Sequence, residues 1–297
     1  MHKAGKEIKE TLPEVDLVIE ILDARIPFSS QNPMLAELRG DKPCIKVLSK
    51  SDLADPLITQ QWQSYLEREQ GVKTLALTIE QPEKMRQIPE LCHKMLPTKE
   101  SSGRLIHSLI MGIPNVGKST LINILAGRII AKTGNEPAIT KNQQRINIGR
   151  GIILLDTPGM LWPNVENKNS GYRLAATGAI KDTAISHDHV AFFAAEYLLQ
   201  HYPALLQTRF QLEQLPDSEQ QLMEVIGKKR GCLRSGGQIE MDKVAKILLS
   251  ELRAGAIGRI SLETPAMMET ELAELKILRE QKEAKKKARK EKWKKSG

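Results

Sequence analysis

The chain has 297 residues, enough for one large or two medium domains with an extensive core. Hydrophobic residues make up 40% and charged residues 27%, an ordinary balance for a soluble globular protein, and no apolar run approaches the roughly 20 residues that cross a bilayer. Three cysteines without a CxxC spacing, and no secretory signal after Met1, argue against a disulfide scaffold or a zinc site. We therefore expect a cytoplasmic protein with no membrane partner.

The first 160 residues alternate between strand-like and helix-like segments. Apolar runs predict five strands, and the last of them is expected to pair with residues 145–148 across a tight turn; the five runs are 16–22, 44–48, 73–78, 105–111 and 151–155. Helical patterns lie between them, at 56–70 and 119–125. This alternation predicts an α/β fold with a doubly wound, mostly parallel sheet.

The pattern becomes helical after Pro163. Four helices are predicted, at 172–180, 189–201, 217–226 and 241–254. Pro203, Gly227 and the stretch 231–237 are interpreted as helix breakers. The predicted organisation is an α/β domain over 1–163, a smaller all-helical domain over 164–268, and a tail over 269–297 that is either a long charged helix or disordered.

Gly112-Ile-Pro-Asn-Val-Gly-Lys118-Ser119 matches the phosphate-loop pattern GxxxxGK[ST], between a predicted strand and a predicted helix. In that context backbone N–H groups cradle phosphates, Lys118 reaches the β- and γ-phosphates, and the Ser119 hydroxyl ligates Mg²⁺. A glycine-rich turn with an exposed lysine is the disfavoured alternative. The predicted phosphate-binding residues are Gly112, Pro114, Asn115, Val116, Gly117, Lys118, Ser119, Thr120 and Gly159.

Asp156-Thr-Pro-Gly159 follows about forty residues later, at the end of a predicted strand. At this position an aspartate holds Mg²⁺ through water, and the Gly159 N–H bonds the γ-phosphate. Thr140 lies between the two motifs, where a switch threonine closes over the metal and the γ-phosphate. Ser119, Thr140 and Asp156 are therefore the predicted Mg²⁺ site.

Ser49-Lys50-Ser51-Asp52 fits the base-reading pattern NKxD apart from Ser49, and it follows the second predicted strand. Asp52 would accept hydrogen bonds from guanine N1–H and the 2-amino group, a donor pair that adenine lacks. The Lys50 stem would pack on the base, and Thr78 and Ile79 would place a backbone loop at guanine O6. The predicted guanine-binding residues are Ser49, Lys50, Ser51, Asp52, Thr78 and Ile79, which makes GTP the expected nucleotide.

The base-reading motif precedes the phosphate motifs, the reverse of ordinary switch GTPases. A domain whose termini lie close together tolerates such circular permutation. The segment that senses the γ-phosphate then runs directly into the helical domain. We therefore expect the nucleotide state to move that domain.

The order SKSD, GIPNVGKS, DTPG resembles the circularly permuted GTPases. Four segments are also similar to the bacterial ribosome biogenesis GTPase A family: 23–33 (DARIPFSSQNP), 137–143, 173–181 and 258–263. This resemblance covers nearly the whole chain. It implies a cytoplasmic GTPase that binds GTP, GDP and Mg²⁺ and acts late in assembly of the large ribosomal subunit, with hydrolysis stimulated by that particle. It also implies that Asn115 helps to ligate K⁺; we further expect a monomer.

Two residues depart from the family pattern. Ser49 replaces an asparagine that ties the base-reading loop to the phosphate loop, and the loss of about one hydrogen bond would weaken affinity roughly 2- to 12-fold. Met160 stands where Ras-like enzymes carry the water-orienting glutamine, and a thioether cannot take that role. The family's catalytic histidine lies in a Pro-Gly-His-Met segment that would precede the start of this sequence. His2 is the candidate substitute, and a solvated terminal histidine is the alternative.

The net charge of +8 is concentrated at the C-terminus, where residues 282–295 carry +7. A lysine-rich stretch with Trp293 suits RNA phosphates and base stacking, and this reading is favoured over a merely solvated charge run. The predicted RNA-binding residues are Lys285, Lys286, Lys287, Arg289, Lys290, Lys292, Lys294 and Lys295.

Two other functions stay open beside the ribosome-stimulated GTPase. One is a GTP-gated rRNA-binding assembly factor with negligible intrinsic hydrolysis, consistent with Met160 and the missing histidine. The other is a metabolic P-loop kinase, which is disfavoured because SKSD and DTPG would have no role in it.

Overall fold

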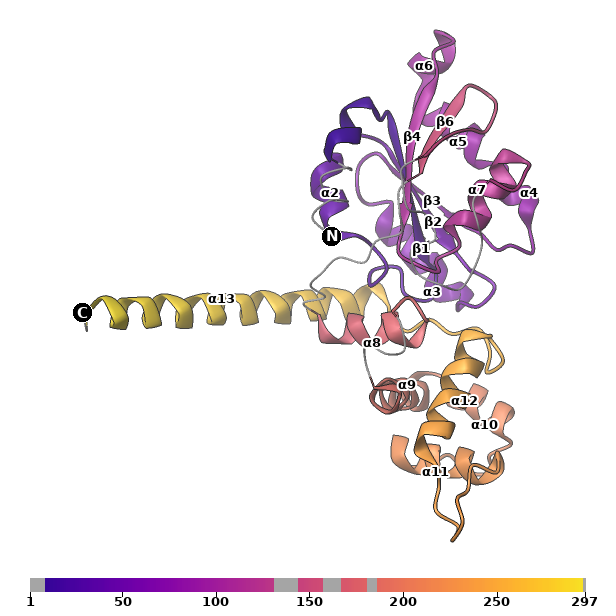
Figure 1. The fold of residues 1–297 in the computed structure, drawn as a ribbon, viewed down its shortest axis with the longest axis vertical. Helices are drawn as coiled ribbons and strands as arrows, with labels where there is room; N and C mark the ends of the chain where they lie inside the picture. The colour runs from indigo at the N-terminus through magenta and orange to yellow at the C-terminus, as the bar shows by residue number, and fades with distance from the viewer. Residues whose placement is uncertain (1–8, 131–143, 157–166, 181–185, 296–297) are drawn as a thin grey trace.

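The computed structural model describes residues 9–130, 144–156, 167–180 and 186–295, except for the side chains of 34, 36, 37 and 287–295. An α/β body and a helical region lie side by side, and one long helix projects from between them (Figure 1). No helix in the described ranges combines the length and the apolar character needed to cross a membrane.

The α/β body is built on a six-stranded sheet in the order β3-β2-β1-β4-β6-β5. All neighbouring strands are parallel except β5 and β6. This confirms the predicted mostly parallel sheet. The strands are β1 (Leu17–Asp23), β2 (Cys44–Ser49), β3 (Val72–Ala76), β4 (Ile106–Gly112), β5 (Gln144–Asn147) and β6 (Ile152–Asp156).

Helices cover both faces of this sheet. Alternate residues of β1 separate the two faces, because Ile19 packs in the cluster that contains α5 and α7, whereas Val18 packs in the cluster that contains Leu35 of α2. Burial on both sides explains why β1 is fully buried along its length. The helices of the body are η1 (Leu12–Glu14, a 3₁₀ turn), α2 (Pro33–Arg39), α3 (Pro56–Leu66), α4 (Pro82–Met85), α5 (Ile88–Met95), α6 (Pro97–Ser101) and α7 (Lys118–Ala126).

The helical region centres on α9, which packs against α8, α10, α11 and α12. Small residues such as Ala191 and Ala194 on α9 are fully buried, which lets the neighbouring helices approach closely. The helices are α8 (Lys168–Ala176), α9 (His187–His201), α10 (Pro203–Phe210), α11 (Glu219–Lys229), α12 (Met241–Arg253) and α13 (Pro265–Lys295).

Of the expected helix breakers, Pro203 separates two helices, because α9 ends at His201 and α10 begins at Pro203, whereas Gly227 does not end α11. Pro203 is the first residue of α10, where its missing N–H has no helical partner to lose. Gly227 lies inside α11 at a close contact between elements, where a Cβ would come within 2.6 Å of Ile239 Cγ2 and 2.9 Å of Val244 Cγ2, which explains the glycine at this position.

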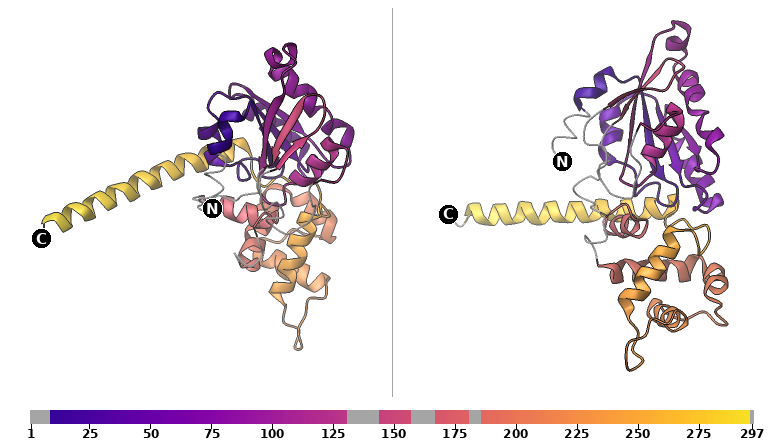
Figure 2. Two further views of the ribbon diagram at one scale, coloured as in Figure 1. Left: turned by 45° about the horizontal axis from the view of Figure 1, so that its top comes forward. Right: turned by 45° about the vertical axis from the view of Figure 1, so that its right-hand side comes forward.

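α13 is one continuous helix of 31 residues. Its first turns lie against α3 and α8, and the rest extends away from the body in every view (Figure 2). The predicted boundary between helical domain and tail, at 268/269, falls inside this helix. The division of the chain into domains otherwise stays a prediction.

Candidate nucleotide-binding site

The predicted nucleotide motifs meet at one edge of the sheet. The phosphate loop (residues 112–119) follows β4, the base-reading loop (residues 49–52) begins at the end of β2, and Asp156 ends β6. The register places Gly112 beside Ile21 and Ser49 beside Asp23, at the carboxyl ends of parallel strands. Ligands of doubly wound sheets bind at this edge. Thr140, Gly159, Met160 and His2 lie outside the described residues.

The phosphate loop has the backbone that its sequence requires. A Cβ on Gly112 would come within 2.8 Å of the Ile21 carbonyl oxygen and of Val116 Cγ1, so only glycine lets the loop pass β1. Asn115 and Gly117 have φ angles of 60° and 95°, a left-handed conformation that these two residue types tolerate best. The loop leads into α7 at Lys118, whose N-terminal N–H groups favour bound phosphate. Ser119 and Thr120 are half-buried on the first turn of α7.

Lys118 and Asp156 form a buried ion pair in which the ammonium contacts the carboxylate directly. Their side chains are 7% and 1% exposed. A buried cation beside a helix N-terminus fits phosphate oxygens, and a carboxylate with the nearby Ser119 hydroxyl fits the oxygen ligands that Mg²⁺ prefers. Among the described residues no three His, Cys, Asp or Glu side chains gather as a metal cluster. A Mg²⁺ held mainly by hydroxyl, water and phosphate oxygens needs no such cluster.

Ser49 joins the base-reading loop to the phosphate loop. Its Oγ lies 2.6 Å from the Val116 carbonyl oxygen and 2.9 Å from that of Leu22. A hydroxyl carries one proton and donates to one of these oxygens at a time. The link expected of an asparagine therefore persists with a single donor, and its effect on affinity stays a prediction.

Lys50 is held by the Asp23-Ala24-Arg25 segment, which the sequence marked only as a family signature. Lys50 has a φ of 55°, and its Nζ lies 3.2 Å from Asp23 Oδ2. Arg25 donates to the same carboxylate through Nε at 2.9 Å and Nη2 at 2.7 Å. Burial raises the pKa of Asp23, but the two cations outweigh it and hold that pKa well below its usual range. The charged Asp23 thus fixes the lysine whose stem is expected to cover the base.

The loop after β3 lies next to the base-reading loop. The backbone N–H of Ser51 donates to the Leu77 carbonyl at 3.1 Å. Thr78 is buried, whereas the side chain of Ile79 is 66% exposed. The structure therefore brings both predicted guanine-binding segments together.

The helical region contacts the base-reading loop through residues 258–263, which we call the docking segment. Arg259 donates to the Ser51 carbonyl through Nη2 at 2.9 Å and to the Ala54 carbonyl through Nε at 3.1 Å. Ile260 N–H donates to the Leu53 carbonyl at 2.9 Å. Sequence reasoning missed these contacts, and the only signal for them was the family resemblance of the segment itself.

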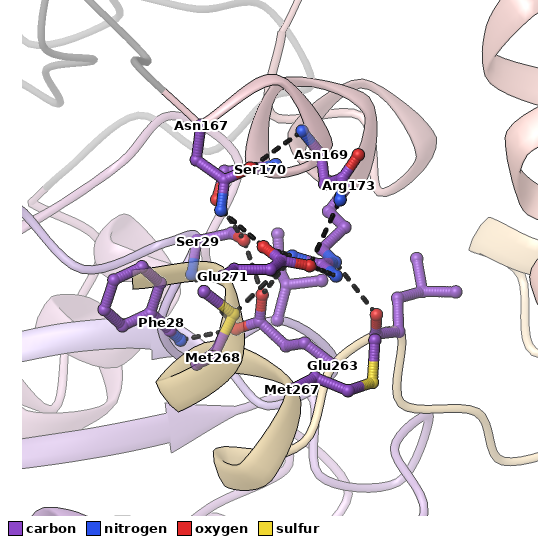
Figure 3. A network of polar contacts seen from close by, with 12 residues as sticks. Phe28, Ser29, Asn167, Asn169, Ser170, Arg173, Glu263, Met267, Met268 and Glu271 are labelled. Atoms are coloured by element: carbon purple, nitrogen blue, oxygen red, sulfur yellow. Dashed lines mark hydrogen bonds and ion pairs between the residues drawn. The ribbon is translucent and has the colours of Figure 1, made fainter. Parts of the chain in front are cut away.

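A buried polar network holds the docking segment to the body and to α8 (Figure 3). Glu263 is fully buried, and its carboxylate accepts the N–H groups of Phe28 at 2.5 Å and Ser29 at 3.0 Å. Burial raises the pKa of Glu263, opposed by Arg173, whose Nη1 lies 3.7 Å away, and by the hydrogen bonds from Ser29. Arg173 in turn donates to both oxygens of Glu271 on α13, at 2.9 and 2.6 Å.

The helical region also contacts the phosphate loop. Asn115, the predicted K⁺ ligand, donates through Nδ2 to the Gly178 carbonyl just after α8 at 3.0 Å. Both loops of the site therefore touch residues beyond the α/β body.

The predicted RNA-binding residues lie on α13. Lys285 and Lys286 are exposed. The backbone of the others belongs to the same helix, and their side chains lie outside the described part. Those residues are Lys287, Arg289, Lys290, Lys292, Lys294 and Lys295.

Comparisons with known proteins agree with this geometry. Residues 107–226 match a family model described as a 50S ribosome-binding GTPase. The chain is 44% identical to the ribosome biogenesis GTPase A of Priestia megaterium over 92% of this chain and 97% of the relative, and 30% identical to that of Thermotoga maritima over 89% and 92%. Two solved structures are similar at 27% identity. The GDP-bound YlqF has a TM-score of 0.63 and covers 88% of this chain and 99% of its own. The GNP-bound YlqF from T. maritima has a TM-score of 0.62 and covers 89% and 98%.

These matches confirm the predicted fold class and the resemblance to the ribosome biogenesis GTPase A family. They show that the chain is a GTP-hydrolysing enzyme. It belongs to the ribosome biogenesis GTPase A family.

Proposed function

We propose that this GTPase acts in the cytoplasm, as a monomer, late in assembly of the large ribosomal subunit. Its partner is the precursor particle, with its rRNA and ribosomal proteins, and that particle stimulates hydrolysis, which is slow without it. The names of the relatives and of the matching family support a ribosomal partner.

One structural observation carries the proposal. The helical region contacts the base-reading loop through Arg259 and the phosphate loop through Gly178. A particle that binds the helical region can therefore alter both loops without entering the nucleotide site. The basic end of α13 provides the contact with rRNA phosphates, where Lys285 and Lys286 are exposed.

The proposed ligands are GTP or GDP with Mg²⁺, and K⁺ as an activator. Lys118, which pairs with Asp156 in this structure, would bind the phosphates, and Asp156 and Ser119 would hold Mg²⁺. Thr140, outside the described residues, would complete the metal site, and the Gly159 N–H, also outside them, would donate to the γ-phosphate. Bound Mg²⁺ supplies positive charge to the phosphates. Asn115 offers its amide oxygen to K⁺ while its nitrogen stays with Gly178.

The test measures phosphate release from GTP and from ATP, with and without purified large subunits, in KCl and in NaCl. We expect phosphate release from GTP but not from ATP. The rate should rise when large subunits are added, and it should be higher in KCl than in NaCl. Tight GTP binding without turnover in any condition would instead indicate a GTP-gated rRNA-binding factor. Turnover that needs a small-molecule acceptor would contradict both functions.

A further inference from the structure

We propose that Arg259 of the helical region is a positioning residue for guanine recognition. It fixes the loop that carries Asp52, and so contributes to discrimination between guanine and bases that lack the 2-amino group. The inference rests on the GTP or GDP binding proposed above and on the guanine site predicted from the sequence, and it does not depend on the ribosomal partner.

Arg259 holds the loop at two points. Its guanidinium reaches from the Ser51 carbonyl at 2.9 Å to the Ala54 carbonyl at 3.1 Å, which are three residues apart. The neighbouring Ile260 N–H donates a hydrogen bond to the Leu53 carbonyl oxygen at 2.9 Å. The peptide carbonyls on both sides of Asp52 are thus bound by two successive residues of the docking segment.

The α/β body also holds the loop. Ser51 N–H donates to Leu77 at 3.1 Å, and Leu53 N–H closes a turn onto the Lys50 carbonyl at 3.0 Å. Lys50 itself has the left-handed φ of 55°. Asp52 therefore lies on a short turn that is held by Leu77, just after β3, and by the docking segment of the helical region.

The docking segment does not need Arg259 in order to stay in place. Leu262 N–H donates to the Arg25 carbonyl at 2.8 Å, and buried Glu263 accepts the N–H groups of Phe28 and Ser29. Arg259 is itself exposed, whereas Ile260, Ser261, Leu262 and Glu263 are buried. Its particular contribution is therefore to the loop, and its removal leaves the anchors of the segment intact.

Position matters here because Asp52 must accept two parallel N–H groups from one base edge. Hydrogen bonds weaken steeply when the angle at the donor departs from linearity. A displaced Asp52 carboxylate can therefore no longer accept both N–H groups well, and the advantage that the guanine 2-amino group provides becomes smaller. A pre-positioned loop also avoids the cost of ordering on binding. Lysine at position 259 would keep the charge, but its single nitrogen cannot bridge two carbonyls in the fixed fork of arginine.

The experiment measures dissociation constants of the full chain for GDP, IDP and ADP. Inosine differs from guanosine only in lacking the 2-amino group. The variants are Arg259→Ala and Arg259→Lys, and the matched control is Arg209→Ala, an arginine of the same region that pairs with Glu251. Melting temperatures accompany each titration, so that folding and recognition are separated.

For Arg259→Ala we expect GDP affinity to fall about three- to tenfold, the scale of one or two hydrogen bonds. The affinity for IDP should fall less, so that the ratio of GDP affinity to IDP affinity becomes smaller. The affinity for ADP should not change. The affinity ratio of Arg259→Lys should lie between those of Arg259→Ala and the wild type. Arg209→Ala should keep the wild-type ratio.

An equal loss for GDP and IDP, or no loss, would overturn the role of Arg259 while leaving the guanine site intact. A wild-type protein that does not prefer GDP to IDP would overturn the guanine site and this proposal together.

Discussion

At the residue scale, Ser49 connects three parts of the nucleotide site with one hydroxyl. Its oxygen lies between the end of β1 and the phosphate loop, within 2.9 Å of a carbonyl in each. An asparagine amide has two N–H groups and could serve both carbonyls at once. The serine therefore keeps the connection with less redundancy.

We expect Ser49→Ala to raise the dissociation constant for GDP about 2- to 12-fold, because a half-buried hydrogen bond of about 0.5–1.5 kcal/mol is lost. Ser49→Asn should lower it by a similar factor. Titration with a fluorescent GDP analogue measures both, with exposed Ser64→Ala on α3 as the control. Unchanged binding by Ser49→Ala would show that the two loops are held together without this hydroxyl.

The Arg173–Glu271 pair is the second residue-scale feature with a measurable consequence. The two side chains are 2% and 13% exposed, and Asn167 and Asn169 also donate to Glu271. Burial raises the pKa of Glu271, but hydrogen bonds from Arg173 and Asn167 outweigh it and lower that pKa below its usual 4.5. The folded state therefore favours the ionised carboxylate.

Glu271→Gln should lower the free energy of unfolding by about 2 kcal/mol at pH 7, because a buried guanidinium loses its bidentate partner. The folded pKa of Glu271 lies below the unfolded one, so its contribution is present above pH 4.5 and is lost as the pH falls through the folded pKa. Urea unfolding at pH 7 and pH 4 should show the wild-type advantage shrinking at the lower pH. Glu274→Gln, exposed on the same helix, is the control. A difference independent of pH would contradict the ionic origin of the effect.

At the element scale, long buried strands were predictable and short helices were not. β1, β2 and β4 lie within about one residue of their apolar runs, because central parallel strands are buried on both faces. α4 and α5 contain few residues, and their helical form depends on burying Met85, Ile88 and Cys92 against the sheet. Windows so short carry no clear helical period.

The site shows the same division between local and distant causes. The phosphate loop and the base-reading loop were predictable because each needs particular residues at fixed spacing, such as the glycines at 112 and 117. Arg259 contacts Ser51 across 208 residues of sequence, and Glu263 contacts Ser29 across 234. No local pattern encodes such partners, so only the folded chain reveals them.

The end of α13 carries a prediction at this scale. If about five of its charges meet phosphates, deleting residues 282–297 should make the slope of log K against log salt less negative by roughly 3.5–4.5 for binding to large subunits. Filter binding at several KCl concentrations measures the slope, with deletion of 296–297 as the control. An unchanged slope would show that α13 does not bind rRNA through its charges.

At the scale of the whole molecule, the helical region contacts the nucleotide site at two places, the phosphate loop and the base-reading loop. α8 follows the Asp156 strand in the chain and contacts α13 through Arg173, and Gly178, just after α8, contacts Asn115 of the phosphate loop. The docking segment returns to the base-reading loop. A change at the phosphates therefore has two routes of contact into the helices.

Hydrogen exchange should record this coupling. Replacing GDP with a non-hydrolysable GTP analogue should change amide protection in α8 and in residues 258–271, because both lie on those routes. The exposed turn at 234–238, far along the helical region between α11 and α12, should not respond and is the internal control. Changes confined to the α/β body would contradict the coupling.

The length of α13 has a mechanical consequence. At about 1.5 Å per residue its 31 residues span about 46 Å, and Met268 and Glu271 in its first turns contact Arg173 of α8. A tilt of about 10° about Glu271 would move the C-terminal end of the helix, about 36 Å further along, by about 6 Å, by the geometry of a rigid rod. A rigid α13 would therefore act as a lever arm. A small displacement at the nucleotide site would then become a larger displacement at the lysine-rich C-terminal end of the helix. That displacement would change which rRNA phosphates the lysines can contact.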